Sequence, residues 1–215
     1  MTREHFIEFL LQAGVLKLGQ FTLKSGRVSP YFFNAGEINT GMQISQLARA
    51  YAATIANSTI GYDVMFGPAY KGIPLVATTA MALAEFHQID VPFVYNRKEK
   101  KDHGEGGRTV GAELKGKVLI VDDVITAGTA VREAIQLIKA QGAEPTGIIV
   151  ALDRMEKGRQ GDQSAIQEIE HEFGIPVISI ITLNDIIDYL AEREHEYAEI
   201  LNAMRQYRSQ YGVEY

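Results

Sequence analysis

The sequence predicts a single α/β domain built around a central, mainly parallel β-sheet with helices on both faces. Short runs of β-branched and aliphatic residues recur along the chain, and stretches with helical periodicity separate them. The strand runs are almost continuously apolar, as expected for strands that are covered on both sides. A chain of 215 residues with 46% hydrophobic residues can bury one substantial core, so we expect one domain over residues 1–215.

Strands and helices are expected to alternate over most of the chain. The strand runs are Asp63 to Phe66, Val91 to Tyr95, Val118 to Val121, Gly147 to Leu152 and Pro176 to Ile181. Between them, apolar residues spaced three or four apart predict helices around Ile44 to Ile55, Leu75 to Phe86 and Val131 to Ile138. The last helix is expected to begin at Thr182, in a capping box with Asp185, and to run past Met204.

The N-terminal part, residues 1–41, departs from this alternation. It offers a short amphipathic helix that contains Phe6 and closes at Gly14, followed by two short strands, Gln20 to Lys24 and Ser29 to Asn34. We expect this part to form a small hood over the sheet.

Residues 97–111, RKEKKDHGEGGRTVG, form a second departure. They show no apolar period and contain four glycines. Long loops inside compact domains are usually functional or disordered, so we expect a flexible loop here. The structural alternative is a solvated charged loop without a role in binding.

Composition limits the function classes. The chain has no cysteine, which excludes disulfides, thiolate nucleophiles and thiolate metal sites. A net charge of −6 argues against a surface for nucleic acid but leaves room for a local cationic pocket. No targeting segment and no apolar stretch of membrane-spanning length stands out, so we expect a cytoplasmic protein without membrane contact.

Two adjacent acids, Asp122 and Asp123, directly follow the run Val118 to Val121. Open α/β sheets bind ligands at the carboxyl ends of their strands. The small, hydroxylated residues that follow lead into a helix, and backbone N–H groups at such a helix start, with the hydroxyls of Thr126 and Thr129, suit a phosphate. Carboxylates repel phosphate, so the acids should accept hydrogen bonds from hydroxyls or hold a hydrated cation. A sugar phosphate satisfies both halves, whereas the structural alternative is an acid pair that merely caps a turn.

The stretch Val118 to Ala130, VLIVDDVITAGTA, resembles the phosphoribosyl diphosphate binding motif of the type I phosphoribosyltransferases. That motif consists of an aliphatic run, two acids and small residues. Four further stretches resemble the bacterial branch of the orotate phosphoribosyltransferase family. They are FTLKSGRVSPYFFNAG (Phe21 to Gly36), GPAYKGIPL (Gly67 to Leu75), RKEKKDHGEGG (Arg97 to Gly107) and ALDRMEKG (Ala151 to Gly158). The resemblance covers essentially the whole chain.

The resemblance implies the type I phosphoribosyltransferase fold and a glycosyltransferase (pentosyltransferase) activity. The enzyme would transfer ribose 5-phosphate from phosphoribosyl diphosphate to orotate, giving orotidine 5-monophosphate and pyrophosphate in the pyrimidine (UMP) biosynthesis pathway. It further implies a homodimer whose loop residues reach the neighbouring subunit's site, and a cis peptide bond between Ala69 and Tyr70. Mg²⁺ should arrive with the substrate and be held mainly by substrate and water, with Asp122 and Asp123 nearby and no direct protein ligand set.

The resemblance also implies roles for individual residues. Asp122, Asp123, Lys101 and His103 are the expected catalytic residues. The expected ligands of phosphoribosyl diphosphate are Lys24, Tyr70, Lys71, Arg97, Lys98, Lys101, His103, Asp122, Asp123, Val124, Ile125, Thr126, Ala127, Gly128, Thr129 and Ala130. The expected ligands of orotate are Lys24, Phe32, Phe33, Thr126 and Arg154.

Three of these residues have ordinary structural interpretations. Without the resemblance, Lys71 would be interpreted as a solvated loop lysine. Arg154 could alternatively be a structural ion-pair partner. One of Phe32 and Phe33 should pack in the core, because successive strand residues point to opposite faces.

Other functions fit part of the pattern. A purine or uracil phosphoribosyltransferase would share the acid pair but differ at the base, and Lys24, Phe32, Phe33 and Arg154 favour a carboxylated pyrimidine. A non-enzymatic regulator could bind phosphoribosyl diphosphate on the same fold, against which the acidic composition and the cationic loop argue. A receiver domain would place its acids near the N-terminus, and a P-loop kinase would need a GxxxxGK[ST] motif that is absent.

Overall fold

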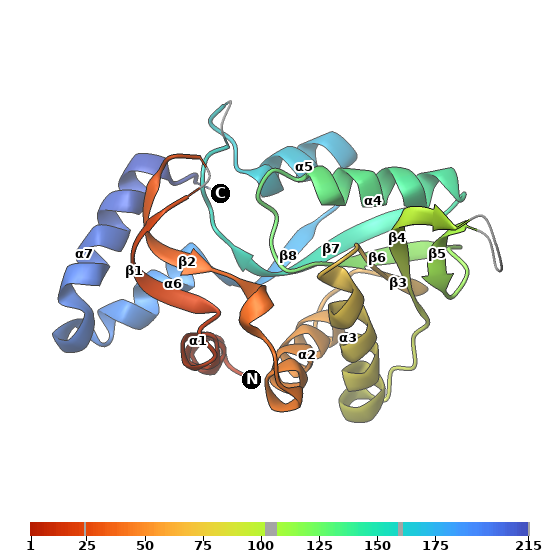
Figure 1. Ribbon diagram of the computed structural model, residues 1–215, viewed down its shortest axis with the longest axis horizontal. Coiled ribbons are helices and arrows are strands. Elements are labelled where there is room, and N and C mark those ends of the chain that lie inside the picture. The colour runs from red at the N-terminus through yellow and green to blue at the C-terminus, as the bar shows by residue number, and fades with distance from the viewer. Residues whose placement is uncertain (24, 102–106, 159–160, 215) are drawn as a thin grey trace.

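The computed structural model describes residues 1–23, 25–101, 107–158 and 161–214, with residues 99–101 and 107 described by their backbone alone (Figure 1). Its centre is a six-stranded sheet in the order β5-β4-β3-β6-β7-β8. The strands are β3 (Val64–Gly67), β4 (Phe93–Lys101), β5 (Gly107–Gly111), β6 (Lys117–Val121), β7 (Glu144–Asp153) and β8 (Val177–Thr182). All neighbours are parallel except β5, which pairs antiparallel with β4 at the edge. The expected, mainly parallel sheet is therefore confirmed.

Helices cover both faces of this sheet. In Figure 1, α4 (Thr129–Ala140) and α5 (Ala165–Phe173) lie on one face, and α2 (Gly41–Ala56) and α3 (Gly72–His87) on the other. Alternate residues of β6 divide between the two layers. Val118 and Ile120 pack in the core under α4 and α5, and Leu119 and Val121 pack in the core under α2 and α3. Because both faces are buried, the strands read as continuous apolar runs, as the sequence indicated.

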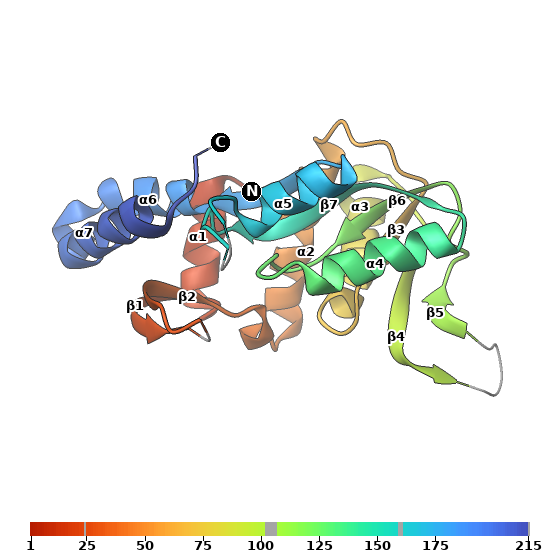
Figure 2. The same ribbon diagram turned by 90° about the horizontal axis from the view of Figure 1, so that it is seen from above.

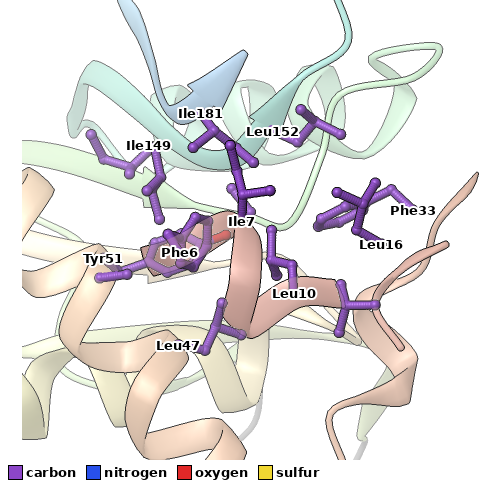
Figure 3. Close-up of a cluster of buried hydrophobic side chains, with 14 of the residues drawn as sticks. Phe6, Ile7, Leu10, Leu16, Phe33, Leu47, Tyr51, Ile149, Leu152 and Ile181 are labelled. Carbon is purple, nitrogen blue, oxygen red and sulfur yellow. The ribbon is translucent and has the colours of Figure 1, made fainter. Parts of the chain in front are cut away.

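The N-terminal hood consists of α1 (Arg3–Gln12) and a two-stranded antiparallel sheet of β1 (Leu16–Thr22) and β2 (Val28–Phe33), followed by the short helix η1 (Ala35–Glu37). Figure 3 shows α1 inserting Phe6 and Ile7 among side chains that include Tyr51 of α2 and Ile149 of β7. The hood therefore shares its hydrophobic core with the main sheet.

The first hood strand begins at Leu16, four residues before the expected Gln20. Leu16 pairs with Phe33, and the register between β1 and β2 shifts between Leu18 and Phe21, around Gly19 with its φ of 145°. This irregularity interrupts the alternation of apolar and polar residues along the strand, so the first half of the strand could not be predicted from the sequence.

The prediction of a loop over the whole of residues 97–111 was wrong. β4 continues to Lys101, and β5 returns along it, with Tyr95 opposite Val110 and Asn96 opposite Thr109. Figure 2 shows this β4–β5 hairpin extending away from the body of the sheet. None of the described side chains in this extension, residues 96–98 and 108–111, is buried, which explains why the sequence has no apolar period there. Residues 102–106 lie outside the described residues.

The expected single C-terminal helix is two helices, α6 (Leu183–Ala191) and α7 (Glu194–Tyr211). The predicted capping box is present, because Asp185 N donates to Thr182 Oγ1 at 3.2 Å and Thr182 N donates to Asp185 Oδ2 at 2.7 Å. The chain turns at Arg193, whose guanidinium donates to the Tyr189 carbonyl at 3.2 Å. The turn brings α7 back to the hood, where Tyr207 packs edge-on against Tyr31 of β2 with ring centroids 6.2 Å apart.

The expected alternation implies a helix between the strand runs Gly147 to Leu152 and Pro176 to Ile181, but its bounds were not predicted, and the structure gives this helix as α5. It begins with a capping box between Ser164 and Gln167, and buries Ile166 and Ile169 against the sheet. Across the described ranges, no helix combines the length and the apolar character that crossing a lipid bilayer requires.

Candidate active site

The acid pair lies between the end of β6 and the start of α4, at the carboxyl edge of the sheet. Backbone hydrogen bonds hold it to β7: Asp122 N donates to the Ile149 carbonyl at 3.0 Å, and Ala151 N donates to the Asp123 carbonyl at 2.9 Å. From α2, the hydroxyl of the buried Tyr51 donates to the Asp122 carbonyl at 2.7 Å. Both acids are 7% exposed. Hydrogen bonds from β7 and α2 therefore hold the backbone of the two acids in place.

The two carboxylates make different contacts. Asp122 Oδ1 accepts from the Asp123 backbone N–H at 2.9 Å, and Asp123 Oδ1 accepts from the Val124 N–H at 2.9 Å. Asp123 Oδ2 also pairs with Lys71 Nζ at 2.9 Å. The pair does cap its own turn, but the contact to Lys71 joins it to a different segment of the chain.

The electrostatics of the pair are unfavourable. Burial, and next the charge of Asp123, raise the pKa of Asp122 to about 7, although the Asp123 N–H and Lys71 act in the opposite direction. A buried pair of acids with one nearby lysine favours ligands that donate hydrogen bonds or carry positive charge.

The segment after the acids forms the start of α4. Gly128 has a left-handed φ of 71° and precedes Thr129, and no side chain caps the helix. The backbone N–H groups of the first turn therefore have no intrahelical partner, and Thr126 and Thr129 are exposed beside them. The arrangement suits an anion such as a phosphate monoester.

Lys71 reaches the acid pair from the turn between β3 and α3. The Ala69–Tyr70 peptide in this turn is cis, as the resemblance implied, and Ala69 N donates to Asn96 Oδ1 at 2.7 Å. The turn passes so close to the sheet that a Cβ on Gly72 would lie 2.7 Å from Pro68 Cδ. Glycine at this position is therefore required for the turn that presents Lys71.

The cationic residues of β4 lie near the same turn. Lys98 Nζ lies 5.1 Å from the centroid of the Tyr70 ring, a cation–π distance, and Arg97 is half-buried on the same strand. Lys101 ends β4, but its side chain is outside the described part of the chain, as are Lys24 and His103. Tyr70, Lys71 and Lys98 are thus brought together.

On the hood, Phe33 is buried in the core, which confirms that one of the two phenylalanines packs there. Phe32 is half-buried, and its ring centroid lies 5.7 Å from that of Phe21.

Arg154, just after β7, forms the ion pair that was its structural alternative. Its Nε and Nη2 donate to Glu156 Oε1 at 3.1 and 3.0 Å. The Tyr31 hydroxyl donates to the same oxygen at 2.6 Å, and the guanidinium lies 5.1 Å from the centroid of the Tyr31 ring. Glu156 therefore occupies one edge of the guanidinium, and the edge with Nη1 faces away from that ion pair. A role of Arg154 in binding orotate stays a prediction.

Four contributors escaped the sequence interpretation: Tyr51, Asn96, Arg132 and Glu156. Tyr51 looked like an ordinary core residue of a helix, Asn96 contacts a segment distant in sequence, and Arg132 contacts a backbone carbonyl. Only Glu156 carried a local signal, because it lies two residues from Arg154.

The part of the chain that the structure describes contains no group of three or more His, Asp or Glu side chains able to hold a metal ion. The acid pair offers two carboxylates, which suits a hydrated Mg²⁺ that takes its remaining ligands from a substrate.

Comparison with known proteins defines the class. The family model of the phosphoribosyl transferase domain matches residues 34–178, which include the acid pair and the start of α4. By fold and site, the chain is a phosphoribosyltransferase domain of type I. A protein named orotate phosphoribosyltransferase from Marinobacter nauticus is 61% identical over 211 residues, covering 98% of both chains, and one from Shewanella oneidensis is 58% identical over 212 residues, covering 99% of this chain and 98% of the relative. The chain belongs to the orotate phosphoribosyltransferase family.

Solved structures agree with this placement. The crystal structure of an orotate phosphoribosyltransferase from Francisella tularensis superposes with a TM-score of 0.89 at 46% identity, covering 97% of this chain and 100% of that one. An adenine phosphoribosyltransferase from Thermoanaerobacter pseudethanolicus shares the fold alone, with a TM-score of 0.51 at 13% identity over 84% of this chain and 99% of that one.

Proposed function

We propose that this chain catalyses the Mg²⁺-dependent transfer of ribose 5-phosphate from phosphoribosyl diphosphate to orotate. The products are orotidine 5-monophosphate and pyrophosphate, and the reaction is a step of pyrimidine (UMP) biosynthesis in the cytoplasm. The observation that carries the proposal is the buried acid pair beside an uncapped helix start, with Lys71 on Asp123 at 2.9 Å.

The acid pair serves the ribose. As the bond from ribose C1 to pyrophosphate breaks, positive charge develops on the ring, and fixed negative charge nearby stabilises it. Asp122 and Asp123 accept hydrogen bonds from the 2- and 3-hydroxyls and so orient the ring. Hydroxyl donors and the developing cation both favour the ionised form of Asp122.

The two phosphate groups bind on opposite sides of the ribose. The 5-phosphate binds at the start of α4, within residues 124–130, to backbone N–H groups that follow Val124 and to the hydroxyls of Thr126 and Thr129. The leaving diphosphate lies near the β3–α3 turn, where Lys71, Tyr70 and Lys98 gather, with Arg97 on the same strand. Asp122 and Asp123 lie where they could hold a hydrated Mg²⁺ together with substrate oxygens, and the ion would neutralise part of the diphosphate charge.

The chain's own cations complete the site. Lys101, the last residue of β4, and His103, two positions later in the sequence, supply the catalytic charge and the proton donor for the leaving group, and Lys24 serves the diphosphate or orotate. These three assignments rest on the resemblance.

The base pocket lies under the hood. Orotate is a planar anion, and Arg154 offers a guanidinium edge to its carboxylate, with backbone groups of Phe32 and Phe33 and the hydroxyl of Thr126 nearby. Glu156 orients the guanidinium and so determines which edge is presented.

We propose a homodimer that pairs through α2 and α3. Met42 of α2 is 73% exposed, and Met81 and Phe86 of α3 are 53% and 42% exposed. Large apolar side chains that remain exposed on a helix pair favour burial against another protein surface. A two-fold related copy would bury the same residues on both subunits.

The test is the consumption of orotate, followed by its ultraviolet absorbance, in the presence of phosphoribosyl diphosphate and Mg²⁺. Parallel reactions replace orotate with uracil, adenine or hypoxanthine. Loss of the orotate signal that depends on both the diphosphate and Mg²⁺ supports the proposal. Turnover of another base but not of orotate overturns the assignment of the base and leaves the proposed sugar site in place. No turnover with any base contradicts the proposed activity and favours a non-enzymatic regulator.

A further inference from the structure

Arg132, one turn into α4, connects the segment before the helix to α5. Its Nη1 donates to the Ala127 carbonyl at 3.0 Å. Its Nε donates to Glu172 Oε2 at 2.7 Å and its Nη2 to Glu168 Oε2 at 3.4 Å. One guanidinium thus joins the segment after the acid pair to two carboxylates on a neighbouring helix. We name Arg132, Glu168 and Glu172 the Arg132 cluster.

The contact with the Ala127 carbonyl has a geometric consequence. The Ala127–Gly128 peptide is trans, so its C=O and its N–H point in opposite directions. Because Arg132 holds the carbonyl toward α5, the N–H of Gly128 points away from α5. A carbonyl turned the other way would present its oxygen where an anion is expected to bind, and would repel it.

Gly128 fits this arrangement in two ways. Its left-handed φ of 71° favours glycine, and a Cβ at this position would lie 2.6 Å from Arg132 Nη1 and 3.3 Å from Ile169 Cδ1 of α5. Residue 128 is therefore packed directly against the cluster.

The cluster is partly exposed, with side-chain exposures of 29% for Arg132, 35% for Glu168 and 46% for Glu172. Ion pairs at such exposure contribute little to stability. The two glutamates also offset the charge of Arg132 and occupy its Nε and Nη2, so the guanidinium is not arranged as a direct phosphate ligand. The contacts of Arg132 therefore contribute more to the orientation of the Ala127–Gly128 peptide than to the stability of the fold.

We propose that Arg132 is a positioning residue for the 5-phosphate of the substrate, acting through the Ala127–Gly128 peptide. The inference rests on the proposed function, since it needs a sugar phosphate bound at the start of α4.

The test compares Arg132→Met, Arg132→Lys and the matched control Glu133→Gln, which changes the exposed neighbouring residue of α4. We expect Arg132→Met to raise KM for phosphoribosyl diphosphate about tenfold and to weaken ribose 5-phosphate binding in calorimetry by a similar factor. KM for orotate should stay within about twofold, because Arg132 does not touch the base pocket. Arg132→Lys should recover part of the affinity, and Glu133→Gln should match the wild type.

Glu172→Gln, which keeps the side-chain length but weakens the anchor of Arg132, should shift KM for phosphoribosyl diphosphate in the same direction by a smaller factor. It provides the test if Arg132→Met fails to fold. Unchanged ribose 5-phosphate binding in the folded variants would overturn the proposal, as would equal losses for both substrates. A wild-type chain that binds ribose 5-phosphate but leaves orotate unchanged would instead contradict the proposed function.

Discussion

At the scale of residues, Asp122 combines burial with a like-charged neighbour, and both are unfavourable for an ionised carboxylate. Its side chain accepts a hydrogen bond from one backbone N–H. Among the described residues, Lys71 is the only cation that forms an ion pair with the two acids, and it contacts Asp123. Such an arrangement costs stability in the free protein and is balanced when a ligand brings hydroxyl donors or positive charge.

The raised pKa of Asp122 predicts a pH dependence of stability. An aspartate has a pKa of about 3.9 in an unfolded chain, whereas burial and Asp123 raise the pKa of Asp122 to about 7 in the folded protein. Between these values the folded chain keeps a proton that the unfolded chain has lost. The contribution of Asp122 to the free energy of unfolding therefore falls as pH rises from about 4 to about 7, and stays low above that range.

Asp122→Asn should remove this part of the pH dependence, because asparagine does not titrate. We expect the variant to be more stable than the wild type at about pH 8, by on the order of 3 kcal/mol, and to differ much less at about pH 4. Urea unfolding at the two pH values measures this difference. An equal difference at both would show that Asp122 has an ordinary pKa.

Glu156 gives a second prediction at this scale. Glu156→Gln removes the charge that orients Arg154, so KM for orotate should rise about fivefold to tenfold while KM for phosphoribosyl diphosphate changes little. Tyr31→Phe, which removes only the hydroxyl bound to Glu156, should act in the same direction by a smaller factor. Steady-state kinetics with each substrate varied would contradict this role if orotate KM stayed at the wild-type value in both variants.

Sequence reasoning selected the acid pair and residues 124–130 as candidates because both are local patterns with a chemical meaning. It did not identify Tyr51 or Asn96, whose contacts depend on α2 and β4 arriving beside segments far away in the sequence. Side-chain contacts of that kind follow from the folded topology and carry no local signature.

At the scale of elements, the buried strands and the helices α2, α3 and α4 followed from periodicity alone. The bounds of α5 were not predicted, although Ser164 and Gln167 form a capping box beside buried Ile166 and Ile169, a signal that the sequence does contain. The outer part of β4, after the predicted run Val91 to Tyr95, and the strand β5 were missed for a different reason, since none of their described side chains from residue 96 on is buried and there is no apolar alternation to detect.

The end of β3 and the start of α3 approach each other so closely at Gly72 that a larger residue there should destabilise the fold. Gly72→Ala places a Cβ 2.7 Å from Pro68 Cδ and 2.9 Å from the Gly67 carbonyl carbon. We expect it to destabilise the fold by about 1 to 3 kcal/mol and to displace the turn that carries Lys71. Chemical denaturation and the orotate assay measure the two effects.

Gly41→Ala, at the first residue of α2, is the matched control. A Cβ there meets nothing within 4 Å. Alanine in a helix is favoured over glycine by up to about 1 kcal/mol, so stability should be equal or slightly higher and activity unchanged. Similar losses in both variants would show that tight packing at Gly72 is not the cause.

At the scale of the whole molecule, the hood and the β4–β5 hairpin both lie toward the lower edge of the view in Figure 2, at different ends of the sheet. The family and its fold could be recognised from sequence because the motifs run in order along the chain. The surface that we propose for a second copy could not be predicted from the sequence, because the exposure of Met42 and Met81 depends on how the chain folds.

The proposed dimer makes a prediction on that surface. Met81→Glu should raise the dimer dissociation constant by at least about tenfold, because it places a charge where apolar contact is expected. Val28→Glu, which places the same charge on an exposed apolar residue of the hood, should leave the dimer intact. Sedimentation velocity over a concentration series decides, and an unchanged Met81→Glu dimer would exclude this face of α3.

The most direct test of the central claim is orotate consumption by the wild type and by Asp123→Asn, each with phosphoribosyl diphosphate and Mg²⁺. Asparagine keeps an acceptor for the Val124 N–H but loses the charge that pairs with Lys71 and that we propose to support the ribose. We predict that the wild type consumes orotate and that the folded variant does so at least about a hundredfold more slowly. A variant as fast as the wild type, or a wild type that leaves orotate unchanged, would contradict the account.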